Sequence, residues 1–161
     1  MIPGLFTSKT NEWETPQDLF EQLNNEFHFT LDPCATEHNR KCKYYYDKDK
    51  NGLVYSWENH SVFMNPPYGK EIYKWVQKAY VSSKFDNSVV VCLLPARTDT
   101  KWFHNFCVKG RIYFLKGRLK FGGQKNSAPF PSMIVVFDKR DIHATMGVYE
   151  QGKIGLCSRR I

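Results

Sequence analysis

The sequence predicts a single α/β domain, with a mostly parallel central sheet flanked by helices. Its 161 residues are enough for one hydrophobic core but not for two, since domains usually span roughly 100 to 200 residues. Apolar segments of strand length, at 62–64, 89–94 and 133–137, alternate with helical patterns, as in sheets built from crossover connections. No repeat or linker divides the chain, so we expect one domain over 1–161, beginning with a loose N-terminal arm over 1–11.

The first elements are predicted to be a helix over 16–26 and a strand over 27–31. Thr15 offers a capping hydroxyl and Pro16 suits the first helical position, and leucines and phenylalanines follow at helical spacing. Apolar and polar residues then alternate over 27–31, which predicts a strand. Asp32 is expected at the carboxyl end of that strand.

The middle of the chain predicts turns, a short strand and a long helix. Residues 36–46 indicate a short helix or an irregular turn, and 51–52 form an Asn-Gly turn signal. A strand over 62–64 leads directly into Asn-Pro-Pro-Tyr at 65–68. Apolar residues then recur at helical spacing over 72–81, which predicts a helix.

The second half begins with the apolar run 89–94, which is typical of a central parallel strand buried on both faces. Asp99 can cap a helix in which Trp102 and Phe103 are expected to be core residues. The remaining segments predict strands over 111–115 and 119–121, a polar loop over 122–131, a strand over 133–137 and a hairpin turning at Gln151-Gly152.

Composition limits the class of function. Lys and Arg number 23 and Asp and Glu 16, a net charge of +7 that favours an acidic partner such as nucleic acid. The longest apolar run, 89–94, is far shorter than the ~18 residues of a membrane helix, and no signal-peptide pattern appears, so we expect a cytoplasmic protein without membrane contact. The five cysteines and five histidines lack metal-ligand spacing, so no metal is expected.

The strongest chemical signals follow the predicted strands. Ligands of parallel α/β sheets bind outside the carboxyl ends of the strands. Residues 32–33, 65–68 and 95–97 fall at such ends. We therefore expect these three segments to meet at one crevice.

The segment 65–68 has the chemistry of a receptor for an amino group. Its two prolines fix the backbone and remove two N–H donors, which leaves the Asn65 side-chain oxygen and the Pro66 carbonyl to accept hydrogen bonds from a planar NH2 group. Tyr68 offers a ring face on which a flat heterocycle can stack. Two such acceptors stabilise the positive charge that develops when the amine attacks an electrophilic methyl group.

These residues resemble a known family. Asn65-Pro66-Pro67-Tyr68 is similar to motif IV of the amino methyltransferases that use S-adenosylmethionine. Further segments resemble the phage-type DNA N-6-adenine methyltransferases of the Dam family: Trp13-Glu14-Thr15-Pro16, Leu31-Asp32-Pro33-Cys34-Ala35, Asn51-Gly52-Leu53 with Trp57, and Ala128-Pro129-Phe130-Pro131-Ser132. The resemblance spans about 13–138. It implies a Rossmann-like methyltransferase fold, S-adenosylmethionine as methyl donor, adenine N6 in DNA as acceptor and, for a phage-encoded enzyme, the bacterial host cytoplasm.

The resemblance also implies functional residues. The catalytic loop corresponds to Asn65, Pro66, Pro67 and Tyr68. The cofactor-binding residues correspond to Thr15, Pro16, Asp32, Pro33, Ala35 and Asn65, with Asp49, or alternatively Asp47, as the acid for the ribose hydroxyls. If DNA is the substrate, its adenine must leave the base stack, and the cations expected to hold the flanking phosphates are Arg97, Lys101, Lys116, Arg118, Lys120 and Lys125.

Three departures from common methyltransferase patterns leave alternatives open. A glycine-rich loop is replaced by residues 32–35, the catalytic loop begins with Asn instead of the frequent Asp, and no separate target-recognition domain is visible. An Asn start also occurs in protein-glutamine methyltransferases. A protein glutamine amide or RNA adenine as acceptor, and a non-catalytic nucleic-acid-binding module of the same fold, therefore remain alternatives. Monomer and homodimer are equally compatible with the sequence.

Overall fold

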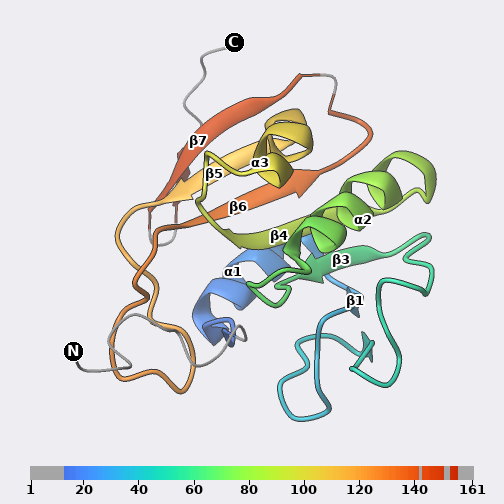
Figure 1. The fold of residues 1–161 in the computed structure, drawn as a ribbon, viewed down its shortest axis with the longest axis horizontal. Coiled ribbons are helices and arrows are strands. Elements are labelled where there is room, and N and C mark those ends of the chain that lie inside the picture. The colour runs from blue at the N-terminus through green and yellow to red at the C-terminus, as the bar shows by residue number, and fades with distance from the viewer. Residues whose placement is uncertain (1–12, 142, 151–152, 156–161) are drawn as a thin grey trace.

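The computed structural model describes residues 13–141, 143–150 and 153–155, and the predicted N-terminal arm lies outside this range. Helices lie on both sides of a central sheet (Figure 1). The elements are α1 (Gln17–Phe27), β1 (Leu31–Asp32), β2 (Tyr44–Tyr45), β3 (Ser61–Met64), α2 (Ile72–Phe85), β4 (Val89–Pro95), α3 (Lys101–Asn105), the 3-10 turn η1 (Cys107–Lys109), β5 (Arg111–Leu115), β6 (Ser132–Phe137), β7 (Thr145–Glu150) and β8 (Lys153–Gly155).

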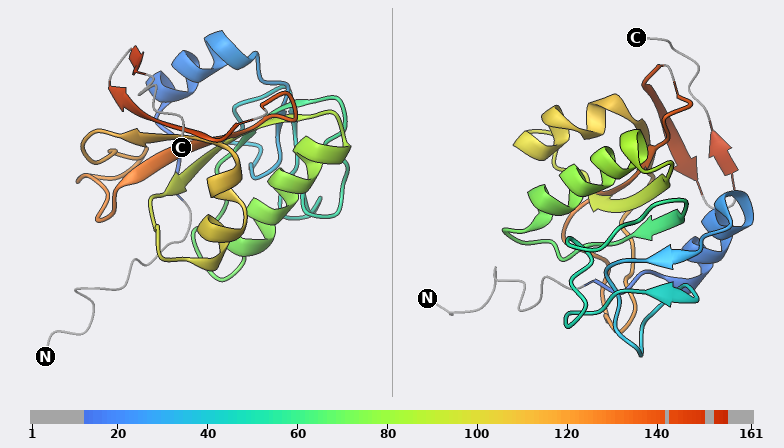
Figure 2. Two further views of the ribbon diagram at one scale, coloured as in Figure 1. Left: turned by 90° about the horizontal axis from the view of Figure 1, so that it is seen from above. Right: turned by 90° about the vertical axis from the view of Figure 1, so that its right-hand side faces the viewer.

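The described strands form one sheet in the order β2-β1-β3-β4-β6-β5-β7-β8. Strands β1 to β4 pair in parallel, and β5 pairs in parallel with β7. Strand β6 is antiparallel to both of its neighbours, and β8 is antiparallel to β7. Helix α1 covers one face of the sheet, and α2 and α3 cover the other (Figure 2). The predicted α/β fold with a mostly parallel sheet is confirmed, with the antiparallel pairings confined to β6 and β8.

The sheet interior follows from the apolar runs. Every residue of β6 is buried, and in β4 only Val89 is partly exposed. The prediction of a buried central strand over 89–94 is confirmed, although one of its neighbours is antiparallel. Trp102 and Phe103 are 5% and 6% exposed, which confirms them as core residues.

The first helix differs from its prediction at both ends. Pro16 is the residue before its first turn, and no side chain caps it, because the Thr15 hydroxyl binds elsewhere. The helix continues to Phe27, where His28 adopts a left-handed conformation with φ of 50°. The predicted strand over 27–31 is therefore wrong, and only Leu31 and Asp32 pair as β1.

Three further predictions need correction. Residues 36–46 contain a short strand, β2, at the edge of the sheet. Thr100, and not Asp99, caps α3 by accepting a hydrogen bond from the Phe103 amide at 3.3 Å. No strand forms over 119–121, where the Leu119 carbonyl instead accepts from the Ala128 amide at 2.7 Å and closes the loop on itself. The hairpin of β7 and β8 is present, while its predicted turn residues, 151–152, lie outside the described range.

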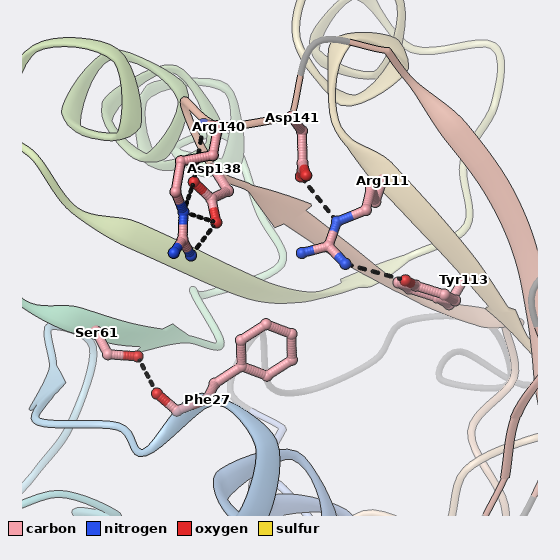
Figure 3. Close-up of polar contacts among 7 residues, drawn as sticks. All are labelled: Phe27, Ser61, Arg111, Tyr113, Asp138, Arg140 and Asp141. Carbon is pink, nitrogen blue, oxygen red and sulfur yellow. Dashed lines mark hydrogen bonds and ion pairs between the residues drawn. The ribbon is translucent and has the colours of Figure 1, made fainter.

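Polar contacts secure the edge of the sheet where β3 and β5 begin (Figure 3). Ser61 donates a hydrogen bond of 2.7 Å to the Phe27 carbonyl, which ties β3 to the end of α1. Arg111 binds Asp141 at 2.7 Å, and Arg140 pairs with Asp138. The side-chain hydrogen bonds from Arg140 hold the pKa of Asp138 below its usual value. The carboxyl ends of β1 and β3 lie at the opposite end of the strands, away from these contacts.

Candidate active site

A cavity of about 550 Å³ lies at the carboxyl ends of β1 and β3, within the range of roughly 300 to 1,000 Å³ common for small-molecule sites. The segments predicted to meet there contribute Asp32 and Pro33 from one side and Asn65 to Pro67 from the other. The third segment, 95–97, does not line it. Two of the three expected segments therefore converge.

Asn65 has one half of its amide fixed and the other half free. Its Nδ2 donates to the Thr15 hydroxyl at 2.9 Å and to the Trp13 carbonyl. Its Oδ1 is buried and has no hydrogen-bond partner among the described residues. A buried acceptor without a partner costs about 1–3 kcal/mol. Such an atom, on a side chain that lines the cavity, is suited to receive a ligand N–H.

Asp32 provides a buried carboxylate in the same cavity. It is 5% exposed, and its two oxygens accept from the backbone amides of Cys34 at 3.2 Å and Lys41 at 3.1 Å. Burial raises the pKa of Asp32 to about 6, partly opposed by these hydrogen bonds and by the nearby Lys41 charge. At neutral pH the carboxylate is therefore mostly ionised and suited to a cationic ligand.

Gly52 closes the wall of the cavity behind Pro33. A Cβ at this position would lie 2.3 Å from the Pro33 carbonyl oxygen and 3.1 Å from the Trp75 ring. The Gly52 carbonyl accepts from the buried Trp57 indole at 2.9 Å. The turn signal at 51–52 therefore also marks a close backbone approach that only glycine permits.

Tyr68 is not open for stacking in this conformation. Its ring is 4% exposed, with Phe130 edge-on at 5.6 Å and Phe121 at 6.3 Å, and its hydroxyl donates to the Leu93 carbonyl at 3.0 Å. Burial raises the pKa of this hydroxyl. The expectation of an available ring face is thus not met in this conformation, because Phe130 of the 122–131 loop and Phe121 just before it lie against the ring.

The other predicted cofactor residues separate into two groups. Thr15 and Ala35 line the cavity, whereas Pro16 and Asp49 do not. Of the two alternative acids, Asp47 lines the cavity just beyond β2, and its carboxylate caps the Lys50 amide at 2.8 Å. The geometry therefore favours Asp47 over Asp49.

The predicted DNA-facing cations are exposed but do not line the cavity. They are Arg97, Lys101, Lys116, Arg118, Lys120 and Lys125. Lys125 adjoins Gln124, which does line it, and the Arg97 guanidinium lies 5.9 Å from the centre of the Phe130 ring. Two of the cations are thereby linked to the loop beside the cavity.

Sequence reasoning missed how the N-terminal segment completes the site. Glu14 forms a bridge with Gly122, whose amide donates to the Glu14 carbonyl at 2.9 Å. The Trp13 ring contacts Phe121 and Phe130, with centroids 5.3 and 5.2 Å away. These contacts join segments over a hundred residues apart, and only the aromatic content of both segments hinted at them.

In the described part of the chain, no group of three or more His, Cys, Asp or Glu side chains is arranged to hold a metal ion. The described helices include none long and apolar enough to cross a membrane.

The fold is similar to that of a solved methyltransferase subunit. A methyltransferase subunit of a type I restriction-modification system from Streptococcus thermophilus superposes with a TM-score of 0.52 at 13% sequence identity. The match covers 91% of this chain but 51% of the larger one, so this chain spans about half of that structure. At this identity the likeness concerns the fold alone.

The chain belongs to the DNA N-6-adenine-methyltransferase (Dam) family, which it matches over residues 5–153. The DNA N-6-adenine-methyltransferase of Haemophilus phage HP1 (strain HP1c1) is 33% identical over 138 residues, covering 80% of this chain and 79% of the relative. The enzyme of the same name from Escherichia phage T1 is 34% identical over 94 residues, which cover 56% of this chain and 38% of the relative. The family resemblance and the enzyme class predicted from sequence, an adenine-N6-specific DNA methyltransferase, are confirmed.

Proposed function

We propose that this protein transfers a methyl group from S-adenosylmethionine to N6 of an adenine extruded from DNA, with Asn65 receiving the amino group. The observation that carries the proposal is the buried Asn65 Oδ1 without a partner, on a side chain whose nitrogen is already committed. Adenine N6 carries two hydrogens and can supply the missing donor. Since Oδ1 is covered in this conformation, neighbouring side chains must shift when the amine arrives.

The cavity residues fit S-adenosylmethionine. The volume suits a ligand of that size, Asp32 offers an anionic group to its positive charge, and Asp47 offers a carboxylate to its ribose hydroxyls. When bound, S-adenosylmethionine supplies an electrophilic methyl group on a positively charged sulfur. Pro33 and Gly52 lie close together in the wall of this site, where a Cβ on Gly52 would meet the Pro33 carbonyl.

The residues of the catalytic loop act on the amine. Asn65 Oδ1 and the Pro66 carbonyl would accept hydrogen bonds from its two N–H groups. These bonds orient the nitrogen and stabilise the positive charge that builds up as the nitrogen–carbon bond forms and the donor's methyl–sulfur bond breaks, with that electron pair left on sulfur. After transfer, the nitrogen loses a proton to solvent. Tyr68, whose hydroxyl is bound to Leu93, can stack on the base only after the Phe130 ring moves aside.

DNA is proposed to approach the loop side of the cavity, beside which Arg97 and Lys125 lie. An adenine must leave the duplex stack to reach Asn65, at a cost of a few kcal/mol. Phosphate contacts from Arg97, Arg118 and Lys125 offset this cost. Because both curated relatives are phage enzymes, the proposed place of action is the cytoplasm of a bacterial host.

The test is a methyl-transfer assay with three acceptors. The protein is incubated with isotopically labelled S-adenosylmethionine and, separately, adenine-containing DNA, RNA of matching sequence, or bacterial protein. We expect label in DNA, recovered as N6-methyladenine after digestion. Label found only in protein or only in RNA would show that DNA is not the acceptor. No transfer to any of the three acceptors by the folded protein would refute the proposed activity.

A further inference from the structure

The rotation of the Asn65 amide is decided by a segment outside the catalytic loop. An asparagine side chain carries two N–H donors and one oxygen acceptor. Here both donors point back at the N-terminal segment, one to the Thr15 hydroxyl at 2.9 Å and one to the Trp13 carbonyl. No N–H remains free, so the amide cannot turn without losing two hydrogen bonds.

The Trp13 carbonyl selects which end of the amide faces it. A hydroxyl such as that of Thr15 can donate or accept, but a carbonyl oxygen can only accept. If the Asn65 amide turned by half a rotation, Oδ1 would face the Trp13 oxygen with no hydrogen between them. The carbonyl therefore sets the orientation, and the Thr15 hydroxyl holds the second N–H in it.

The segment that carries these acceptors is itself held on both sides. Thr15 is 5% exposed. On one side, the Pro16 carbonyl accepts from the Phe20 amide at 3.1 Å in the first turn of α1. On the other, Glu14 is bridged to Gly122. Because the segment is anchored on both sides, the Thr15 hydroxyl and the Trp13 carbonyl hold fixed positions and determine the orientation of the Asn65 amide.

We infer that Thr15 is a positioning residue, whose hydroxyl and the neighbouring Trp13 carbonyl clamp the Asn65 amide with Oδ1 turned toward the substrate amine. This inference rests on the proposed function of Asn65. It assigns the Thr15 hydroxyl a role beyond the cofactor contact and beyond the helix cap expected from its sequence position. It also accounts for asparagine at position 65, because an ionised aspartate has no hydrogen to give to the Trp13 carbonyl.

The first experiment compares Thr15→Val, which keeps the shape but removes the hydroxyl, with Thr15→Ser, which keeps the hydroxyl. Thr145→Val, on β7 beside the edge strand β8 and away from β1 and β3, is the matched control. We expect kcat to fall about tenfold in Thr15→Val and to stay within about twofold of the original in Thr15→Ser, since misplaced reacting groups lose rate steeply. KM for S-adenosylmethionine and the rate of Thr145→Val should change little. A Thr15→Val enzyme with unchanged kcat would overturn the inference, and so would a Thr15→Ser enzyme as slow as Thr15→Val.

A second readout does not depend on activity. In ¹⁵N-labelled protein, the side-chain NH2 of Asn65 should exchange its hydrogens slowly with solvent, and several-fold faster in Thr15→Val than in Thr15→Ser. Equal exchange in all three proteins would overturn the clamp even if methylation is normal. Absence of methylation by the original protein, with slow exchange preserved, would instead refute the proposed function and leave the clamp in place.

A variant at Asn65 tests the same inference if Thr15→Val does not fold. At saturating S-adenosylmethionine, Asn65→Asp should be nearly inactive at pH 8 and gain activity relative to the original protein as the pH falls, because a protonated carboxyl regains one O–H donor for the Trp13 carbonyl. Asn65→Asp as active as the original protein at pH 8 would overturn the inference.

Discussion

The buried carboxylate of Asp32 should make cofactor binding depend on pH. Its pKa is raised to about 6 by burial, and a cationic ligand prefers the ionised form. At that pKa about one tenth of the carboxyl groups are ionised at pH 5 and about nine tenths at pH 7, so the affinity for S-adenosylmethionine should rise about tenfold over this interval. Calorimetric titration at a series of pH values measures the change, and Asp32→Asn is the control that should lose it.

The raised pKa of Asp32 also predicts how the free energy of unfolding changes with pH. The folded pKa of about 6 lies above the ordinary value of 3.8, so the folded state binds the proton more tightly than the unfolded state. The free energy of unfolding, taken relative to Asp32→Asn, should therefore fall by about 3 kcal/mol as the pH rises from about 4 to about 6, and stay level above that. Urea unfolding of both proteins across this range is the assay. A difference that stays constant, or grows with pH, would refute the account of Asp32, as would a cofactor affinity that is equal at pH 5 and pH 7.

Four substitutions test the remaining residues. Asn65→Ala should lower methyl transfer at least about 100-fold, as loss of a preorganised acceptor does, while calorimetry shows S-adenosylmethionine still binding; transfer within tenfold of the original would contradict its role. Tyr68→Phe should lower the free energy of unfolding by about 1 kcal/mol through loss of the Leu93 hydrogen bond and keep most activity, whereas a dead enzyme would mean that the hydroxyl takes part in the reaction. Gly52→Ala should weaken cofactor binding, because its Cβ collides with the Pro33 carbonyl; unchanged affinity would show that Pro33 does not contact the cofactor. Lys125→Ala should weaken DNA binding and reduce the slope of log affinity against log salt by about 1. The matched control is Lys139→Ala, at an exposed lysine just after β6. Equal effects of the two substitutions would argue against a DNA contact at Lys125.

Local patterns in the sequence were sufficient for much of the fold. The runs that became β4 and β6 are apolar throughout, so burial on both faces follows from composition alone. The candidate loop at 65–68 and the acid at Asp32 could be located because the loop follows one strand and Asp32 ends another, and parallel strands share one carboxyl edge.

Other features depend on contacts between distant segments and could not be predicted. Strand β2 is only two residues long and pairs with an equally short β1. Two residues are too few to show an alternating pattern, and the polar, tyrosine-rich sequence around them predicts no strand. Thr15 matches a helix cap locally, but its hydroxyl binds an amide 50 residues away. Tyr68 is covered by Phe130, which reaches it from a loop that reads as polar.

The most direct measurement of the central claim is a crystal structure of the protein with an adenine-containing oligonucleotide and a cofactor analogue that has no transferable methyl group. The account predicts adenine N6 at hydrogen-bond distance, about 2.7–3.2 Å, from Asn65 Oδ1, with Nδ2 still on Thr15 and Trp13. An adenine held elsewhere, or an Asn65 oxygen bonded to the protein itself in that complex, would contradict it.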